Sequence, residues 1–437
     1  MNEPAATPPK LLGFWSCWAL AVGTMIGSGI FLLPAALAPY GMLSFGGWIL
    51  GGLGTIALGL VFGRLASRTT RDGGPYIYVQ EAFGDLAGFL MAWGYWISFW
   101  ISIPVVAIAF VGYLGVFVPG LSANPIAQAL AALALIAVFT LVNIRGLKEM
   151  SAVQIAMTVL KIIPLVAIVG VALFFGAPRN LPPFNPSHAP ILPSLAAVTL
   201  ITLWPFTGFE TAVTSASSVR DCARTIPRAL TAAILLVTAI YLATMFGVML
   251  LVPADQLARS QAPFVDAAHA LGPWGAGFIA IGAMIATAGT LNGIVFTSGQ
   301  MLMAVAEDGK APRWLATLNK GGAPYIAILI SSIFGAILLL MNYSRGFIGA
   351  YTFLLMMATA VTLIYYFFSA LAELKHSWRA AKGWTLLALF ACLYALFAMV
   401  GSGLEVLFWG GVLMLAGVPL FFLFRSKKPA SLASQQA

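Results

Sequence analysis

Two ionisable side chains stand deep within long apolar stretches of this 437-residue sequence. Lys161 lies inside the apolar segment 151–176, and Glu210 lies near the middle of 192–219. A charge at the centre of a membrane costs about 2.5–3.5 kcal/mol on insertion scales, so such residues mark functional sites by default. Proton exchange or ion binding would use them. The alternatives are that Lys161 snorkels to an interface and that a protonated Glu210 ties two helices together.

Glycine, serine and proline interrupt two of the apolar stretches. The first contains GTMIGSGIF, from Gly23 to Phe31, and the sixth contains WPFTGFE, from Trp204 to Glu210. Unwound backbone survives in lipid only where protein or a water-filled cavity satisfies its hydrogen bonds. A single break is weak evidence, because small residues also serve helix packing. Two breaks at equivalent positions of two five-span halves are the layout of an inverted-repeat transporter.

The chemistry of such a site follows from the broken backbone. Unwinding frees amides at the start of the second half-helix, around Ser28 and Gly29, and these suit a carboxylate. It also frees carbonyls at the end of the first half-helix, and these suit an ammonium group. The carbonyls in question are those of Met25, Trp204 and Thr207. A site that pairs both kinds of group predicts an α-amino acid as ligand.

The composition requires lipid as the solvent of this chain. Hydrophobic residues make up 61% and charged residues 8%, whereas soluble domains carry roughly 25% charged residues. This excludes a soluble, disordered or disulfide-stapled protein. Three cysteines and three histidines, far apart in the sequence, give no pattern for a metal site, a cofactor or a hydrolase triad.

A membrane span needs about 20 apolar residues, and the sequence predicts twelve such spans. They are 11–36, 42–64, 86–118, 125–144, 151–176, 192–219, 228–252, 273–305, 323–342, 347–372, 384–401 and 403–424. The predicted units are a tail (1–10), a first repeat (11–176), a second repeat (192–372), two further spans (384–424) and a second tail (425–437).

Lys and Arg residues flank alternate span ends. Only Arg179, Arg259 and Arg345 lie on the opposite side, apart from Lys161 inside its span. The positive-inside rule therefore predicts that both termini are cytoplasmic. The net charge of +9 reflects this topology and does not indicate a nucleic-acid partner.

The motifs GTMIGSGIFLLP, DGGPYIYVQEAFG, WPFTGFE and EDGKAP resemble those of the amino acid–polyamine–organocation (APC) superfamily, and the resemblance spans essentially the whole chain. It is strongest to the bacterial basic amino acid/polyamine antiporters of the arginine/agmatine type. The resemblance implies an all-α polytopic membrane protein of the bacterial cytoplasmic (inner) membrane. The implied fold is a LeuT-type five-plus-five inverted repeat with broken first and sixth helices and two extra C-terminal helices.

The resemblance also assigns roles to residues. The motif from Gly27 to Gly29 would bind the substrate carboxylate, and the carbonyls named above would hold its amino group. The Trp204 ring matches an aromatic gate, and Tyr95 matches a tyrosine of the cytoplasmic gate. Glu210 matches a glutamate implicated in proton-dependent antiport.

The sequence departs from the arginine/agmatine antiporters where the substrate side chain would lie. Ile294 stands at the position of a stacking tryptophan, Ile103 at that of an asparagine, and Met356 in an apolar run at that of a serine. A desolvated guanidinium without partners loses several kcal/mol, so these changes favour a small or apolar neutral substrate. Ser98 or Asn292 could instead supply other polar contacts.

Lys161 is a further departure. Arginine/agmatine antiporters have an apolar residue there, whereas proton-coupled APC transporters have a lysine in the place of a sodium ion. The resemblance thus implies that Lys161 bridges the first and eighth spans without sodium. It does not separate proton symport from exchange.

The sequence therefore predicts a sodium-independent secondary active amino acid transporter whose partners are the substrate, protons and the bilayer. An arginine/agmatine or other basic amino acid–diamine antiporter is the alternative within transporters, and a homodimer stays open. A membrane-embedded enzyme lacks a nucleophile cluster, and a channel lacks repeated polar rings. A transporter-like sensor would differ in binding its ligand without flux.

Overall fold

The computed structural model describes residues 13–27, 29–68, 75–145, 161–210 and 219–424, where the regular elements are helical. Nine helices in these ranges are long and apolar enough to cross a membrane. They are α3 (Leu43–Ala66), α5 (Asp85–Leu114), α6 (Pro125–Arg145), α11 (Cys222–Leu251), α14 (Gly272–Glu307), α15 (Tyr325–Asn342), α16 (Phe347–Ser377), α17 (Lys382–Val400), and α18 (Gly403–Leu415) continued by α19 (Gly417–Phe424). The chain is an all-helical multi-pass membrane protein, as the sequence predicts.

The first span is interrupted where the sequence predicts a break. Helix α1 (Phe14–Met25) ends at Ile26, whose backbone is extended, and α2 (Gly29–Leu37) begins three residues later. Together with the short 3-10 turn after α2, the pair has the length and apolarity of one span and bends by 49°. Counting the pair as one span gives ten.

The fifth and sixth predicted spans are described only in part. Helix α8 (Ile163–Phe175) and helix α9 (Ile191–Leu203) belong to them, whereas 146–160 and 211–218 lie outside the described residues. Helix α9 gives way to a 3-10 turn, η4 (Trp204–Phe206), and then to Gly208 at φ 101°, a conformation that favours glycine. The count of twelve spans, the repeat boundaries and both tails remain predictions.

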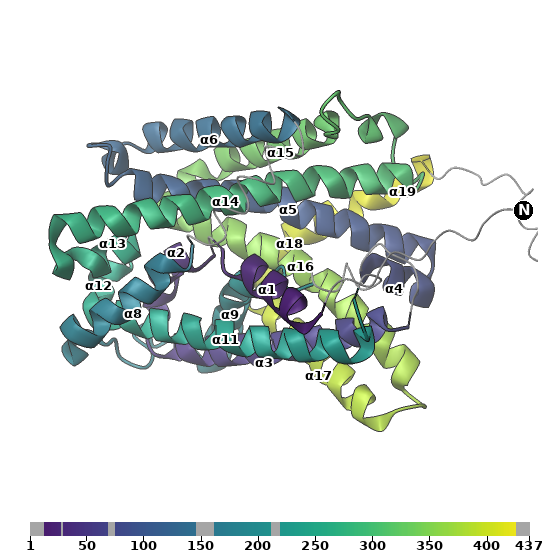
Figure 1. The fold of residues 1–437 in the computed structure, drawn as a ribbon, viewed down its shortest axis with the longest axis horizontal. Helices are drawn as coiled ribbons and strands as arrows, with labels where there is room; N and C mark the ends of the chain where they lie inside the picture. Colours follow the sequence, from purple (N-terminus) through teal and green to yellow (C-terminus); the bar gives the residue numbers. More distant parts are fainter. Residues whose placement is uncertain (1–12, 28, 69–74, 146–160, 211–218, 425–437) are drawn as a thin grey trace, which may run out of the picture.

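The helices form two groups (Figure 1). One group contains α1, α3, α9 and α11, and the other contains α5, α6, α14 and α15. Helix α16 contacts both, because it packs along α5 and also against α3 and α9. Each group takes helices from both halves of the chain, which is the arrangement that an inverted repeat predicts.

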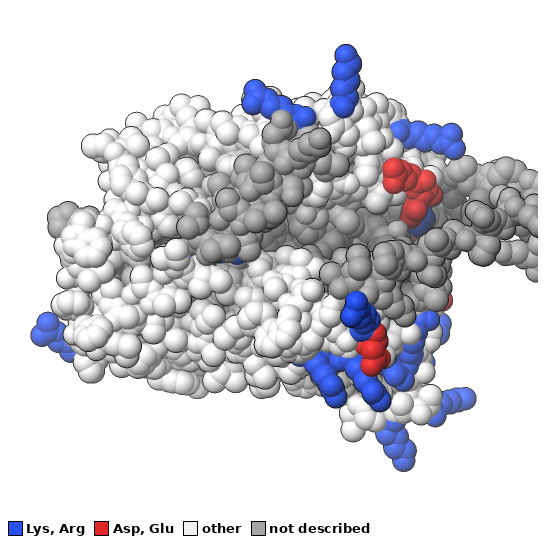
Figure 2. Space-filling model, viewed as in Figure 1, with Lys and Arg blue, Asp and Glu red and all other residues white. Residues whose placement is uncertain are grey.

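Basic side chains gather at one end of the molecule. Figure 2 shows most Lys and Arg side chains at the end where α4 (Pro75–Phe83) lies, and a largely uncharged surface over the middle. A largely uncharged surface beside one basic end fits a protein whose lateral surface faces lipid (Figure 2).

Candidate substrate site at the two helix breaks

The two breaks lie against each other in the core. A Cβ atom placed on Gly29 would lie 2.9 Å from the Cβ of Pro205 and 3.0 Å from Cδ1 of Trp204. The Thr24 hydroxyl, from the last turn of α1, donates a hydrogen bond of 2.9 Å to the Gly208 carbonyl. The structure therefore brings together the residues that the sequence predicts to bind the polar end of the substrate. Ser28 lies outside the described residues, so its role remains a prediction.

Helix α14 borders the first break. A Cβ atom on Gly27 would lie 3.0 Å from the hydroxyl oxygen of Thr290. Ile294 lies one helical turn beyond Thr290, on the same face of α14. Ile294 is thus on the side of α14 that faces the break.

The predicted carbonyl acceptors differ in the number of hydrogen bonds that they accept from other described residues. The Trp204 carbonyl accepts bonds from the Thr207 amide at 3.1 Å and from the Thr207 hydroxyl at 2.7 Å. These two bonds occupy both of its lone pairs. The Met25 carbonyl accepts a bond of 2.7 Å from the Tyr241 hydroxyl of α11, and among the described residues this is one bond fewer than the Trp204 carbonyl accepts.

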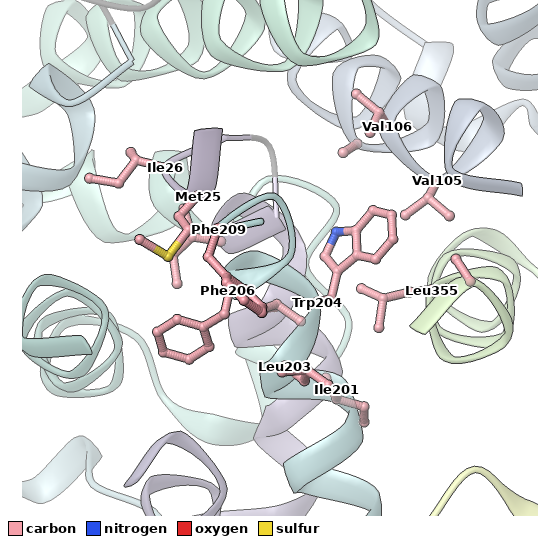
Figure 3. Close-up of a cluster of buried hydrophobic side chains, with 14 of the residues drawn as sticks. Met25, Ile26, Val105, Val106, Ile201, Leu203, Trp204, Phe206, Phe209 and Leu355 are labelled. Carbon is pink, nitrogen blue, oxygen red and sulfur yellow. The ribbon is translucent and has the colours of Figure 1, made fainter. Parts of the chain in front are cut away.

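Apolar side chains surround the Trp204 indole. Figure 3 shows Val105 and Val106 of α5 and Leu355 of α16 around this ring. These side chains and Trp204 are buried. The part of the site next to the Trp204 ring therefore offers van der Waals contact rather than hydrogen bonds.

Two of the predicted side-chain contacts, Ile103 and Met356, belong to α5 and α16, the helices that also carry the apolar residues around Trp204 (Figure 3). Ile103 packs against α15, because its Cβ is 3.1 Å from the position of a Cβ on Gly335. Met356 follows Leu355, the residue of α16 that lies beside Trp204. Consecutive helical residues point about 100° apart. The roles of Ile103 and Met356 as substrate contacts therefore remain predictions, and Val105, Val106 and Leu355 of the same two helices are the apolar side chains seen around Trp204 (Figure 3).

The polar side chains considered as alternative contacts each make a hydrogen bond within the helix groups, although the buried Asn292 Nδ2 atom has no partner among the described residues. The Ser98 hydroxyl donates to the Tyr95 carbonyl at 2.7 Å within α5. Asn292 accepts a bond of 3.0 Å from the Asn143 side chain of α6. Neither hydrogen bond involves the two breaks.

Glu210 lies buried at the end of the sixth-span break and accepts three hydrogen bonds from other described residues. Tyr95 of α5 donates to Oε1 at 2.8 Å, while Tyr366 of α16 and the Gly208 amide donate to Oε2 at 2.9 and 3.0 Å. The carboxylate thus ties the break to α5, a member of one group, and to α16, which contacts both groups. Tyr366 was not predicted from the sequence, because YYFF in an apolar helix gives no signal of its partner.

Lys161 is buried just before α8, and its ammonium group donates to the Gly23 carbonyl in the last turn of α1. Helix C-termini carry partial negative charge and stabilise a cation. This contact places the Lys161 charge beside the first break, whereas the bridge to the eighth span remains a prediction. Within the described ranges, no three His, Cys, Asp or Glu side chains form a metal-binding group.

Comparison with known proteins identifies the family to which this chain belongs. Residues 12–419 match the family described as amino acid permease. The chain is 30% identical to the putative arginine/ornithine antiporter of Bacillus subtilis, with 95% of each chain covered. It is also 30% identical to the cadaverine/lysine antiporter of Escherichia coli, over 90% of each chain. The arginine/ornithine antiporter of Pseudomonas aeruginosa is 30% identical too, over 92% of this chain and 88% of its own. Because the family match covers nearly the whole sequence and both helix breaks, the chain belongs to the amino acid permeases of the APC superfamily, which are membrane transporters and not enzymes.

Proposed function

We propose that this protein is a sodium-independent antiporter that exchanges a basic amino acid for a related amine or amino acid. Support comes from the two adjacent breaks, which present main-chain groups to a zwitterion. The named activities of the relatives, arginine/ornithine and cadaverine/lysine antiport, add to it. These relatives favour the basic-substrate alternative over the neutral substrate that the sequence predicts. The apolar wall beside Trp204 suits the methylene stem of a lysine or ornithine side chain.

A small or apolar neutral amino acid is the second candidate. Val105, Val106 and Leu355 supply no hydrogen bond for a terminal charge beside Trp204. The nearby Lys161 ammonium would also repel a second positive charge on the substrate. Both observations favour a neutral ligand.

Counterflow into proteoliposomes separates the two candidates. The liposomes are loaded with ornithine, cadaverine, putrescine or agmatine, and the uptake of labelled arginine or lysine is measured against that of leucine or alanine. One-for-one exchange of the basic amino acids supports the proposal. Uptake of leucine or alanine alone, with no effect of internal diamine, would replace it with the neutral candidate.

Transport would proceed by alternating access. The substrate binds at the breaks, Trp204 closes over it, and α1 and α9 rock against the group that contains α5 and α14. Protonation of Lys161, Glu210 or both would bias the protein between inward-facing and outward-facing states, because both groups contact a break. The membrane is the bacterial cytoplasmic membrane, with the basic end of the molecule inside.

The variants Lys161→Ala and Glu210→Gln test the coupling. Each removes a titratable group beside a break, so we expect each to flatten the pH dependence of exchange. The measurement is the rate of exchange in proteoliposomes across a range of pH values. The same pH dependence in wild type and in both variants would refute proton coupling through these residues.

A further inference from the structure

Helix α1 ends in carbonyl oxygens that its own backbone cannot satisfy, because the last four carbonyls of an α-helix lack intrahelical donors. Two of these, from Gly23 and Met25, accept hydrogen bonds from side chains outside α1. Lys161 donates to the first and Tyr241 donates to the second. The site chemistry described above gives a role to Lys161 but none to Tyr241.

Tyr241 reaches both helix breaks with one hydroxyl group. The hydroxyl oxygen lies 2.7 Å from the Met25 carbonyl oxygen and 3.2 Å from the Pro205 carbonyl oxygen. Its ring centroid lies 5.2 Å from that of Trp48 and 5.6 Å from that of Phe206. The whole residue is buried. Rigid aromatic packing therefore fixes the hydroxyl between the first break and the sixth.

Two carbonyl oxygens that converge from two interrupted helices are the groups with which unwound backbone coordinates a sodium ion in transporters. In apolar surroundings such a pair needs either a cation or a hydrogen-bond donor. The Tyr241 hydroxyl supplies a donor that carries no formal charge. Its single proton serves mainly the shorter bond, to Met25, and the longer bond to Pro205 is the weaker branch of a shared interaction.

We propose that the Tyr241 hydroxyl takes the place of a coordinated cation between the two breaks. It ties α11 to α1 and to η4, so that the broken segments keep a fixed relative position. Together with the Lys161 ammonium at Gly23, it accounts for the sodium independence on which the proposed function rests. Removal of the hydroxyl leaves a buried carbonyl pair that a small cation can fill.

The variant Tyr241→Phe tests this directly, because the ring keeps its packing against Trp48 and Phe206 and only the donor is lost. The thermal unfolding of the full-length protein, purified in detergent, is measured in NaCl and in equimolar KCl or choline chloride. In KCl and choline chloride the variant melts below wild type. NaCl raises its melting temperature by about 2 °C or more and leaves wild type unchanged, because a ligand that binds only the folded state stabilises it.

A matched control comes from another buried tyrosine of the same region. Tyr113 also has a fully buried ring, and its hydroxyl donates to the Phe31 carbonyl of α2 at 2.8 Å. Tyr113→Phe leaves the Phe31 carbonyl and the Phe264 amide without this partner and does not create a carbonyl pair between two breaks. We expect this variant to melt below wild type in every salt and to show no selective response to sodium.

A rescue experiment covers the case in which Tyr241→Phe does not fold. Tyr241→4-aminophenylalanine keeps the ring and offers two N–H donors, one for each carbonyl. We expect this variant to fold and to have a higher melting temperature than Tyr241→Phe. We expect its melting temperature to be the same in NaCl and in KCl. A rescue protein that does not fold, or that responds to sodium as Tyr241→Phe does, contradicts the proposal. A Tyr241→Phe protein that melts lower without any sodium response also overturns it, since Tyr241 would then be a packing residue.

These unfolding measurements need no substrate. If counterflow shows no exchange of basic amino acids while the sodium response of Tyr241→Phe is present, the proposed substrate class fails and the role of Tyr241 stands. Where exchange is measurable, the rate of Tyr241→Phe in KCl falls by roughly tenfold and recovers in part in NaCl, because a fixed geometry at the breaks is lost and then restored.

Discussion

Glu210 connects three parts of the molecule through its two carboxylate oxygens. Its hydrogen bonds come from Tyr95 on α5, from Tyr366 on α16 and from the Gly208 amide of its own turn. Any movement of the sixth-span break relative to α5 or α16 must break at least one of these bonds. The hydrogen bonds of Glu210 are therefore expected to be intact when this end of the site is closed and to break when it opens.

Variants of two adjacent tyrosines of α16 distinguish the effect of the Tyr366–Glu210 hydrogen bond from the effect of ring packing. Tyr366→Phe removes a donor to a buried carboxylate, and the loss of such a partner costs about 1–3 kcal/mol. We expect exchange by this variant to slow by roughly tenfold, since about 1.4 kcal/mol corresponds to a factor of ten. Tyr365 is equally buried, and its hydroxyl has no hydrogen-bond partner among the described residues. Tyr365→Phe should therefore stay within about twofold of wild type. Equal losses in the two variants would assign the effect to ring packing instead.

Gly29 determines how closely the two breaks approach. A methyl group there would lie 2.9 Å from the Pro205 Cβ and 3.0 Å from Trp204 Cδ1, closer than real Cβ contacts. Gly29→Ala must therefore push the sixth-span break away, at a cost of about 1–3 kcal/mol for an overpacked core. We expect uptake to fall by roughly tenfold or more, mainly through weaker substrate binding. The measurement is the half-saturation concentration of exchange.

Gly411 provides the control for that substitution. A Cβ atom at Gly411 of α18 would have nothing within 4 Å, so Gly411→Ala should transport like wild type. If both alanine variants behave alike, the close approach of the breaks at Gly29 has no bearing on uptake.

The sequence predicts the breaks well, because glycine and proline act on their own local backbone. The face of a helix on which a given residue lies is harder to predict from sequence, because consecutive residues point about 100° apart. The sequence therefore names Ile103 and Met356 on α5 and α16, and it does not single out Val105 or Val106, which Figure 3 shows around Trp204. Tyr241 and Tyr366 carry no local signal, since tyrosines also occur in helices as interfacial anchors. Their carbonyl and carboxylate partners are far away in sequence and appear only in the fold.

At the scale of elements, a cap covers the end of the site away from the basic end. It consists of α12 (Ala254–Leu257), α13 (Pro263–Ala268) and the residues between them. The Phe264 ring lies 5.0 Å from that of Phe31, and the Phe264 amide donates to the Tyr113 hydroxyl at 3.4 Å. The cap therefore holds α2 against α5.

Gly112 of α5 allows this cap to dock. A Cβ atom at Gly112 would lie 2.1 Å from the carbonyl oxygen of Gln261, and a backbone atom cannot rotate out of the way. We expect Gly112→Ala to lift the cap, so hydrogen exchange across 254–271 becomes faster while other helices keep their protection. Gly170→Ala in α8 is the control, because a Cβ there meets nothing within 4 Å. Unchanged exchange in Gly112→Ala would mean that the cap is not held at this point.

At the scale of the whole molecule, α16 joins the two helix groups, and an ion pair fixes it at the basic end. Arg68, just beyond α3, lies 3.1 Å from the buried carboxylate of Glu373 on α16. Glu373 is thus paired near the end where most Lys and Arg side chains gather (Figure 2). This ion pair therefore lies where the end of α3 meets α16, the helix that contacts both groups. The surface over the middle of the molecule carries few charged side chains (Figure 2).

This distribution of charge predicts the orientation in the membrane. Lys320 lies between η7 (Arg313–Ala316) and α15, on the predicted cytoplasmic side, Arg179 lies in η3 (Pro178–Asn180), on the predicted opposite side, and both are exposed. In a background without Cys17, Cys222 and Cys392, each position is replaced by cysteine in turn, and intact cells are treated with a membrane-impermeant maleimide. We expect Arg179→Cys to react in intact cells and Lys320→Cys to react only after the membrane is opened, because basic loops stay on the cytoplasmic side. Reaction of Lys320→Cys in intact cells would invert the predicted topology and place the basic end of the molecule outside the cell.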